Sequence, residues 1–271
     1  MPHVHTADGV TIDYSTVGSG APVVLVHGIT ESRAAWDPIV PPLADAGYRV
    51  ISVDLRGHGA SSMARRYDLG SMAADVAAVV EAVDADEGAS GDAGDGSRPL
   101  LIGHSLGGAV VSAAAAAMPV RGVINVDQSL ALAGFKEGLG QIEPMLRGSP
   151  EAFAMAMAAI FDQLVGPLAP PERARIEALR QPRQAVVLGI WDLVLTASAD
   201  ELDAQVAALA GAIRAPYLSL HGVDPGDHYA AWLGERIASA TVEVWPGQGH
   251  YPHLVDPVRF VSRVLAFDPR D

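Results

Sequence analysis

The chain has 271 residues, a formal net charge of −14 and no cysteine. Its length suits one large domain or a core with an inserted subdomain, and its 49% hydrophobic residues argue against overall disorder. The acidic balance argues against a nucleic-acid partner, which would require a basic face. The lack of cysteine excludes disulfides, thiolate metal sites and a cysteine nucleophile.

The first ten residues show neither the basic nor the apolar segment of a signal peptide. Two Ala-rich stretches, at residues 109–118 and 152–161, are too short to span a bilayer. We therefore expect a cytoplasmic protein with no membrane partner.

Short strands and helices alternate in the first 127 residues. We predict strands at residues 10–17, 22–26, 48–53, 99–102 and 122–126, and helices at 36–46, 71–83 and 105–118. Apolar β-branched runs such as PVVLV are typical of strands that are buried on both faces. This alternation predicts a mainly parallel sheet with helices on both faces.

The pattern changes after Asp127. Residues 128–199 contain no strand signal but several helical stretches, at 143–146, 151–165, 171–179 and 183–195. We interpret them as a helical cap inserted into an α/β core formed by residues 1–127 and 200–271. The core resumes with helices at 200–213, 227–238 and 257–267 and with strands at 216–220 and 241–245.

A Gly- and Asp-rich segment at residues 84–97 separates a predicted helix from the next strand. A calcium loop would require the EF-hand spacing and its terminal Glu, which the segment lacks. We expect a solvated, mobile connection.

The strongest local motif is Gly103-His104-Ser105-Leu106-Gly107, which lies between an apolar strand and a helix of small residues. A sharp strand-to-helix turn raises the hydroxyl above the sheet edge and leaves no room for side chains at the flanking glycines. The free N–H groups of the helix N-terminus favour developing negative charge there. We predict that Ser105 is a nucleophile; the alternative is a simple helix cap.

A serine nucleophile needs a base, and His250 is the candidate among nine histidines. It follows the last predicted strand, so its loop lies at the same sheet edge as Ser105. We expect His253 to serve surface or packing duty, with a supporting contact to the base as the alternative. His104 is expected to pack under the turn.

The loop His27-Gly28-Ile29-Thr30 directly follows the PVVLV strand. The backbone N–H groups of Ile29 and Leu106 could together hold an oxyanion, although a plain strand-exit turn is the alternative. We further predict that the substrate pocket includes Gly28, Thr30, His104 and Trp191.

The chain contains four motifs: HGIT, DLRGHGAS at residues 54–61, GHSLGG and GQGHYPH. Through these motifs it resembles the α/β-hydrolase superfamily over nearly its full length. The resemblance implies an α/β-hydrolase fold and a serine, an acid and a histidine in that chain order, with the acid orienting the histidine. It also implies a structural role for the turn at residues 56–59. Haloalkane dehalogenases and epoxide hydrolases are disfavoured, because those branches use Asp where this chain has Ser105.

The acid departs from the family pattern. The family usually places it three residues beyond a Gly after the next-to-last strand, and that position is Pro225 here. Asp224 could serve with a displacement of one residue. Some members instead carry the acid at the end of an earlier strand, which is Asp127 in this chain. We favour Asp127 over Asp224, with Asp227 third.

These residues predict hydrolysis of an apolar, medium-sized ester or lactone through an acyl-enzyme, with no metal or cofactor. The apolar cap residues that could enclose a substrate are Phe135, Met145, Phe153, Met155, Met157, Phe161 and Trp191. Thioester, amide and carbon–carbon bond cleavage and cofactor-free perhydrolysis remain alternatives on this scaffold. A non-catalytic ligand-binding protein is the alternative from another class, and the oligomeric state stays open.

Overall fold

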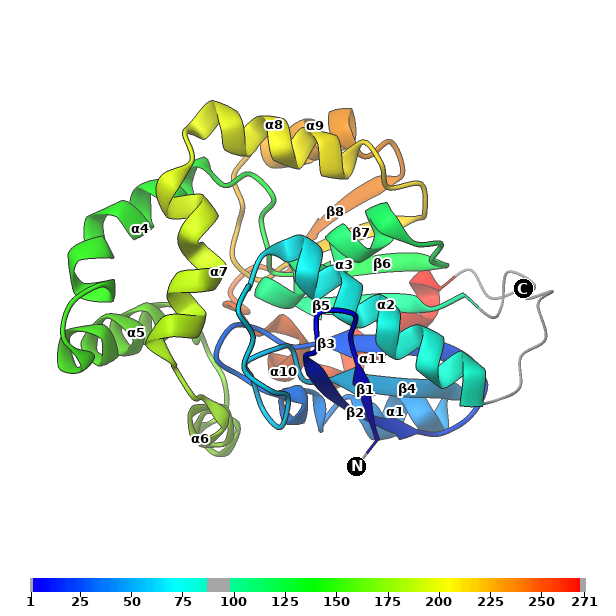
Figure 1. Ribbon diagram of the computed structural model, residues 1–271. Helices are drawn as coiled ribbons and strands as arrows, with labels where there is room; N and C mark the ends of the chain where they lie inside the picture. Colours follow the sequence, from blue (N-terminus) through cyan, green and yellow to red (C-terminus); the bar gives the residue numbers. More distant parts are fainter. Residues whose placement is uncertain (1, 87–97, 269–271) are drawn as a thin grey trace.

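The computed structural model describes residues 2–86 and 98–268. Its sheet has the order β1-β2-β4-β3-β5-β6-β7-β8 (Figure 1). The β1–β2 and β2–β4 pairs are antiparallel, and all other neighbouring pairs are parallel. The strands are β1 His3–His5, β2 Thr11–Val17, β3 Ala21–Val26, β4 Tyr48–Val53, β5 Leu100–His104, β6 Gly122–Val126, β7 Tyr217–His221 and β8 Ala240–Val244.

Helices cover both faces of the sheet, because successive strand residues point to opposite sides. Val24 and Val26 of β3 pack in one apolar cluster with α2 and α3, whereas Val23 and Leu25 pack in another with α1 and α11. The helices outside residues 128–198 are α1 Val40–Asp45, α2 Leu69–Asp86, α3 Leu106–Ala117, α8 Ala199–Ala210, α9 Tyr229–Arg236, α10 Pro252–Val255 and α11 Pro257–Phe267, with a 3₁₀ helix η1 at Arg33–Trp36. The predicted fold class, a mainly parallel sheet between helices, is confirmed.

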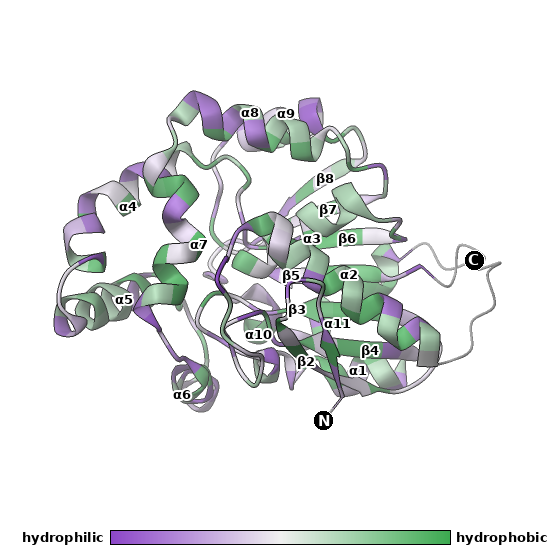
Figure 2. Ribbon diagram, viewed as in Figure 1, coloured by the Kyte–Doolittle hydropathy of each residue, from purple (hydrophilic) through white to green (hydrophobic). Residues whose placement is uncertain are grey.

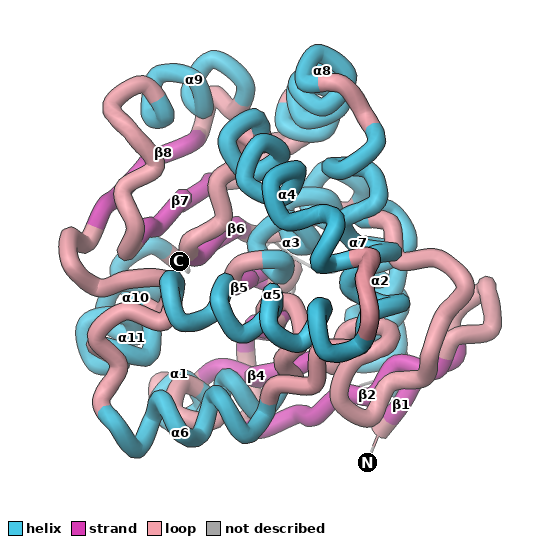
Figure 3. The backbone as a smooth tube through the Cα atoms, turned by 90° about the vertical axis from the view of Figure 1, so that its left-hand side faces the viewer, coloured by secondary structure: helices cyan, strands magenta, loops and turns pink. Residues whose placement is uncertain are grey.

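The residues that follow β6 form four helices, α4 Ala133–Leu146, α5 Pro150–Leu164, α6 Pro170–Leu179 and α7 Gln184–Thr196, and we refer to residues 128–199 as the helical insertion. These helices lie together on one side of the molecule (Figure 1), and α4 contacts α5 and α7. The view turned by 90° shows them in front of the sheet (Figure 3). In Figure 2 the central strands are largely hydrophobic, whereas α6 and α8 carry many hydrophilic residues.

Two predicted elements need correction, and the structure adds a strand. The helix expected at residues 36–46 is split into η1 and α1, because Pro41 and Pro42 occupy the first turn of α1 and cannot continue an earlier helix. Helix α4 begins at Ala133, ten residues before the predicted start, since its glycines and Pro144 have low helix propensity and conceal it. Strand β1 was not predicted, because its three residues give too short a pattern.

Helix α2 continues to Asp86, so the first residues of the predicted connection at 84–97 are helical. Residues 87–97 of that segment lie outside the described residues. In the described part of the chain, no helix combines the length and apolar character needed to cross a membrane.

Candidate active site

Ser105 occupies the turn between β5 and α3 with φ 52° and ψ −124°, a backbone conformation that residues other than glycine rarely adopt. Its backbone N–H donates to the Val126 carbonyl at 2.9 Å. A Cβ on Gly103 would lie 2.1 Å from the Gly107 carbonyl oxygen, and a Cβ on Gly107 would lie 2.1 Å from the Val26 carbonyl oxygen. The two glycines are therefore required by close backbone packing, as the motif predicts.

Positive φ angles mark the site. Within residues 2–86 and 98–268, the non-glycine residues with positive φ are Thr30 at 66°, Ser105 at 52° and Asp127 at 52°. They follow β3, β5 and β6, which are neighbours in the sheet. Such conformations cost free energy and persist where the surrounding structure fixes them, commonly at functional sites.

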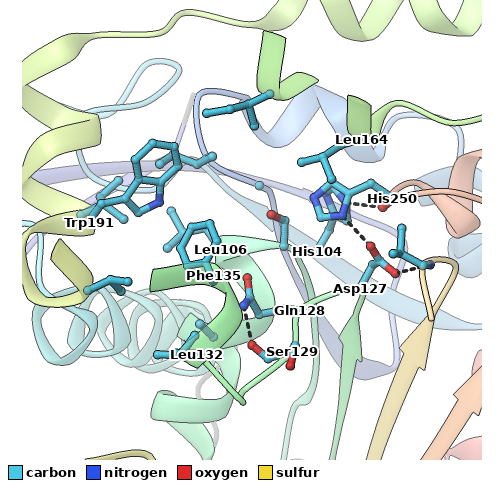
Figure 4. Close-up of a pocket in the computed structure, with 18 of the residues that line it drawn as sticks. His104, Leu106, Asp127, Gln128, Ser129, Leu132, Phe135, Leu164, Trp191 and His250 are labelled. Atoms are coloured by element: carbon cyan, nitrogen blue, oxygen red, sulfur yellow. Dashed lines mark hydrogen bonds and ion pairs between the residues drawn. The ribbon is translucent and has the colours of Figure 1, made fainter. Parts of the chain in front are cut away.

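Asp127 and His250 are in direct contact. Asp127 Oδ2 accepts a hydrogen bond from His250 Nδ1 at 2.6 Å (Figure 4). Asp127 Oδ1 accepts from the backbone N–H groups of Gly222 at 2.7 Å and Val223 at 3.0 Å. Burial alone would raise the pKa of Asp127, but His250 and these N–H groups outweigh burial and lower it. The carboxylate therefore fixes the imidazole with Nδ1 protonated.

Asp224, the alternative acid, is exposed, and its Oδ1 accepts from the Gly226 N–H at 2.9 Å. Asp227 is also exposed. Within the described residues, no hydrogen bond or ion pair joins either carboxylate to His250. The structure thus brings Asp127, and not Asp224 or Asp227, to the histidine.

The backbone of His250 is held on both sides. Its N–H donates to the Leu164 carbonyl at 3.0 Å, and its carbonyl accepts from His104 Nε2 at 2.8 Å. Ser105 and His250 line the same cavity. No hydrogen bond joins Ser105 Oγ to His250 in the described chain.

The backbone N–H groups of Ile29 and Leu106 have no acceptor among the described residues. Both residues are buried, and both line the cavity. The first turn of α3 packs directly against the end of β3 at Gly107, so these two donors belong to adjoining segments. Two free N–H groups beside a nucleophile are what stabilisation of an oxyanion requires.

The cavity has a volume of about 790 Å³ and lies between the sheet edge and the helical insertion. Of the residues predicted for the substrate pocket, Gly28, His104 and Trp191 line the cavity and Thr30 does not. Thr30 is 1% exposed, and its carbonyl accepts from the Gln181 N–H at 2.7 Å, so the insertion covers it.

Of the apolar cap residues named from the sequence, those that line the cavity are Phe135, Met157, Phe161 and Trp191. Met145 and Met155 are exposed to solvent, and Phe153 is buried in the core. Among the described residues, no lysine or arginine lines the cavity, whereas the acidic residues that do so are Glu31, Asp68, Asp127, Asp192 and Asp224.

Two further histidines are buried around the site. His104 is 1% exposed, and its ring centroid lies 4.7 Å from the ring centroids of His250 and Tyr251. His253 is also 1% exposed and packs on Trp36 at 4.6 Å. The packing role expected for His253 is confirmed, and the surface role is wrong.

Sequence reasoning missed Glu31. Its side chain is 2% exposed, lines the cavity, and accepts a hydrogen bond from the Tyr251 hydroxyl at 2.7 Å. The available signal was an acidic residue immediately after the HGIT motif, in a loop that must be buried beside the nucleophile.

A model of the alpha/beta hydrolase family matches residues 23–263. The non-heme haloperoxidase of Rhodococcus erythropolis is 29% identical over 98% of this chain and 99% of that protein. The non-heme chloroperoxidase of Streptomyces lividans is 41% identical, over 41% of this chain and 38% of that protein. The crystal structure of a hydrolase from Pseudomonas aeruginosa superposes with a TM-score of 0.77 at 20% identity, covering 99% of this chain and 98% of the other. The chain therefore belongs to the α/β-hydrolase family and is an enzyme of the hydrolase type.

Proposed function

We propose that the enzyme is a serine hydrolase that cleaves uncharged, apolar carboxylic esters or lactones through an acyl-enzyme on Ser105. The observation that carries this proposal is the 2.6 Å hydrogen bond from His250 Nδ1 to Asp127, at the cavity that Ser105 lines. An imidazole held in this tautomer has Nε2 free to accept the serine proton.

In this mechanism Ser105 Oγ attacks the acyl carbon while His250 Nε2 takes the hydroxyl proton. The N–H groups of Ile29 and Leu106 stabilise the oxyanion. The bond to the leaving oxygen then breaks, and His250 returns the proton to the alcohol. Water next attacks the acyl-enzyme with His250 again as base, which releases the carboxylic acid and restores Ser105.

The lining of the cavity supports an uncharged substrate. A volume of about 790 Å³ suits a medium-sized molecule, and aromatic and Met side chains of the insertion provide apolar contact. With several acidic side chains and no lysine or arginine in the described lining, a substrate carboxylate would meet repulsion without a permanently charged partner.

We assign residues 1–127 and 200–271 to the catalytic core and residues 128–199 to a cap that encloses the substrate. Contacts between the insertion and the site segments support this division. The Gln181 N–H donates to the carbonyl of Thr30 in the loop that carries Ile29, and the Leu164 carbonyl accepts from the backbone of His250.

The test is the hydrolysis of p-nitrophenyl acetate, p-nitrophenyl butyrate and mono-p-nitrophenyl succinate, together with a panel of lactones. We expect turnover of the neutral esters that Ser105→Ala abolishes, and a kcat/KM for the anionic ester at least about tenfold lower. Full activity in Ser105→Ala, or no turnover by the unaltered enzyme, would overturn the proposal.

Perhydrolysis is a second candidate, favoured by the match to the Rhodococcus haloperoxidase over nearly the whole of both chains. Hydrogen peroxide would replace water in the attack on the acyl-enzyme and release a peracid, which in turn could oxidise halide. Bromination of an indicator in the presence of bromide, peroxide and acetate measures this activity. It must require Ser105 if it occurs at the same site.

A further inference from the structure

A buried carboxylate, Glu31, connects the loop that carries Ile29 with the loop that carries His250. Its Oε1 accepts from the Tyr251 hydroxyl at 2.7 Å, and its Oε2 accepts from the Gly28 N–H at 3.3 Å. Tyr251 is the immediate chain neighbour of His250, and Gly28 is the immediate neighbour of Ile29. One side chain thus contacts the residues beside a proposed oxyanion donor and beside the proposed base.

Glu31 also faces the segment of the nucleophile. Its Oε2 lies 3.8 Å from His104 Nδ1, and His104 is the residue before Ser105. The opposite nitrogen of the same ring, Nε2, donates to the His250 carbonyl at 2.8 Å. His104 therefore connects the surroundings of Glu31 to the backbone of His250. His104 and Tyr251 are each 1% exposed.

The charge state supports a functional role for this carboxylate. Burial alone would raise the pKa of Glu31, but His104, Tyr251 and His27 outweigh burial and hold it at about 2. Burial and the adjacent Glu31 charge raise the pKa of Tyr251 well above its ordinary value, so its hydroxyl remains a donor. A buried ion is costly compared with an apolar side chain of similar size, which makes mere space filling a poor account of Glu31.

We propose that Glu31 is a positioning residue for the hydrolysis assigned to Ser105, and the inference rests on that proposed function. It holds the Gly28–Ile29 backbone and, through Tyr251 and His104, the backbone of His250. It touches neither reacting atom in this scheme. Its removal should therefore lower kcat, because the oxyanion donor and the base lose their fixed geometry. The apolar walls of the cavity are unaffected, so KM for a neutral ester should change little.

The experiment measures kcat and KM for p-nitrophenyl butyrate in Glu31→Ala, Glu31→Gln, Tyr251→Phe and the double variant Glu31→Ala/Tyr251→Phe. We expect Glu31→Ala to lower kcat by about 30-fold or more with KM within about threefold. Glu31→Gln keeps an acceptor for Tyr251 and should recover most of that loss. Because the Tyr251 hydroxyl donates to Glu31, its removal should add nothing once Glu31 is gone, so the double variant should be no slower than Glu31→Ala.

The matched control is Glu235→Gln on α9, where the side chain is 76% exposed and a normal kcat is expected. Glu31→Ala with a kcat within about twofold of the unaltered enzyme would overturn the inference. So would full additivity with Tyr251→Phe, or a Gln variant as slow as the Ala variant. If Glu31→Ala does not fold by circular dichroism, an unchanged kcat in the near-isosteric Tyr251→Phe overturns it instead. Failure of the proposed function is distinguishable, because the unaltered enzyme would then show no Ser105-dependent turnover.

Discussion

The sheet edge and the helical insertion contribute to the same cavity in different ways. At the sheet edge, the backbones of Thr30, Ser105 and Asp127 have positive φ angles. The polar side chains of Asp127, His250 and Glu31 are buried there and form hydrogen bonds. The insertion instead supplies apolar surface, with Phe135 and Trp191 packed edge to face at 5.8 Å.

This difference suggests a division of labour. Reaction chemistry depends on atoms held within a fraction of an ångström, which a fixed backbone between strand and helix can provide. Pocket shape depends on side-chain volume, and packed apolar surfaces accept many substitutions. Changes at the sheet edge should therefore act on kcat or on folding, whereas changes in the insertion should act on KM.

The largest expected effect concerns the acid. Asp127→Asn should lower kcat by about three to four orders of magnitude, since the amide no longer fixes the imidazole tautomer that catalysis needs. Asp224→Asn, at an exposed carboxylate without a contact to His250, is the matched control and should stay within about threefold. Equal losses in the two variants, measured with p-nitrophenyl butyrate, would show that Asp127 is not the orienting acid.

One methyl group added to the sheet edge and one added to the insertion should have opposite effects on stability. Gly107→Ala would bring a Cβ to 2.1 Å from the Val26 carbonyl oxygen, and we expect a loss of at least about 2 kcal/mol in the free energy of unfolding. Gly138→Ala in α4 has no atom within 4 Å of the new Cβ, so helix propensity should stabilise the protein by about 0.5–1 kcal/mol. Urea unfolding measures both, and effects of the same sign would contradict the contrast between the regions.

Removal of apolar surface from the insertion should have a smaller effect, mainly on KM. Trp191→Ala deletes a side chain that is 7% exposed and should raise KM for p-nitrophenyl octanoate by about tenfold, with kcat within about threefold. Met155→Ala is the control, because Met155 is 66% exposed and does not line the cavity. A loss confined to kcat in Trp191→Ala would mean that the insertion takes part in the chemistry.

The ionised carboxylate of Glu31 should make the stability of the folded chain depend on pH in acid. The pKa of Glu31 is about 2 in the folded chain, below the ordinary value of 4.5, so the unfolded chain binds this proton more readily. The stability that Glu31 contributes is therefore complete above about pH 4.5 and is lost as the pH falls towards about 2. The difference in free energy of unfolding between the unaltered enzyme and Glu31→Gln should shrink from pH 7 to pH 3. A difference that is independent of pH would contradict the lowered pKa, and Glu235→Gln should follow the unaltered enzyme throughout.

Much of the sheet edge could be predicted from sequence, because each motif follows a strand. The runs before Gly28, Ser105 and Asp127 identify strands that end at one edge, and glycine spacing identifies the sharp turn. The choice between Asp127 and Asp224 needed three-dimensional structure, since both lie on loops at that edge. Only the fold shows which carboxylate faces His250.

The remaining features depend on contacts between distant segments. The bond from Tyr251 to Glu31 joins residues 220 positions apart, and no local pattern pairs them. The sequence predicts Thr30 in the pocket because it shares a loop with Gly28, which lines the cavity, yet Gln181 from the insertion covers Thr30. The start of α4 was missed because tertiary packing outweighs the low helix propensity of its glycines.

Labelling by a fluorophosphonate probe, read by intact mass and peptide mapping, tests the identity of the nucleophile most directly. We expect one equivalent of adduct on Ser105 in the unaltered enzyme, no adduct in Ser105→Ala, and much slower labelling in Asp127→Asn. Adduct on another residue, or retained labelling of Ser105→Ala, would contradict the assignment of Ser105 as the nucleophile.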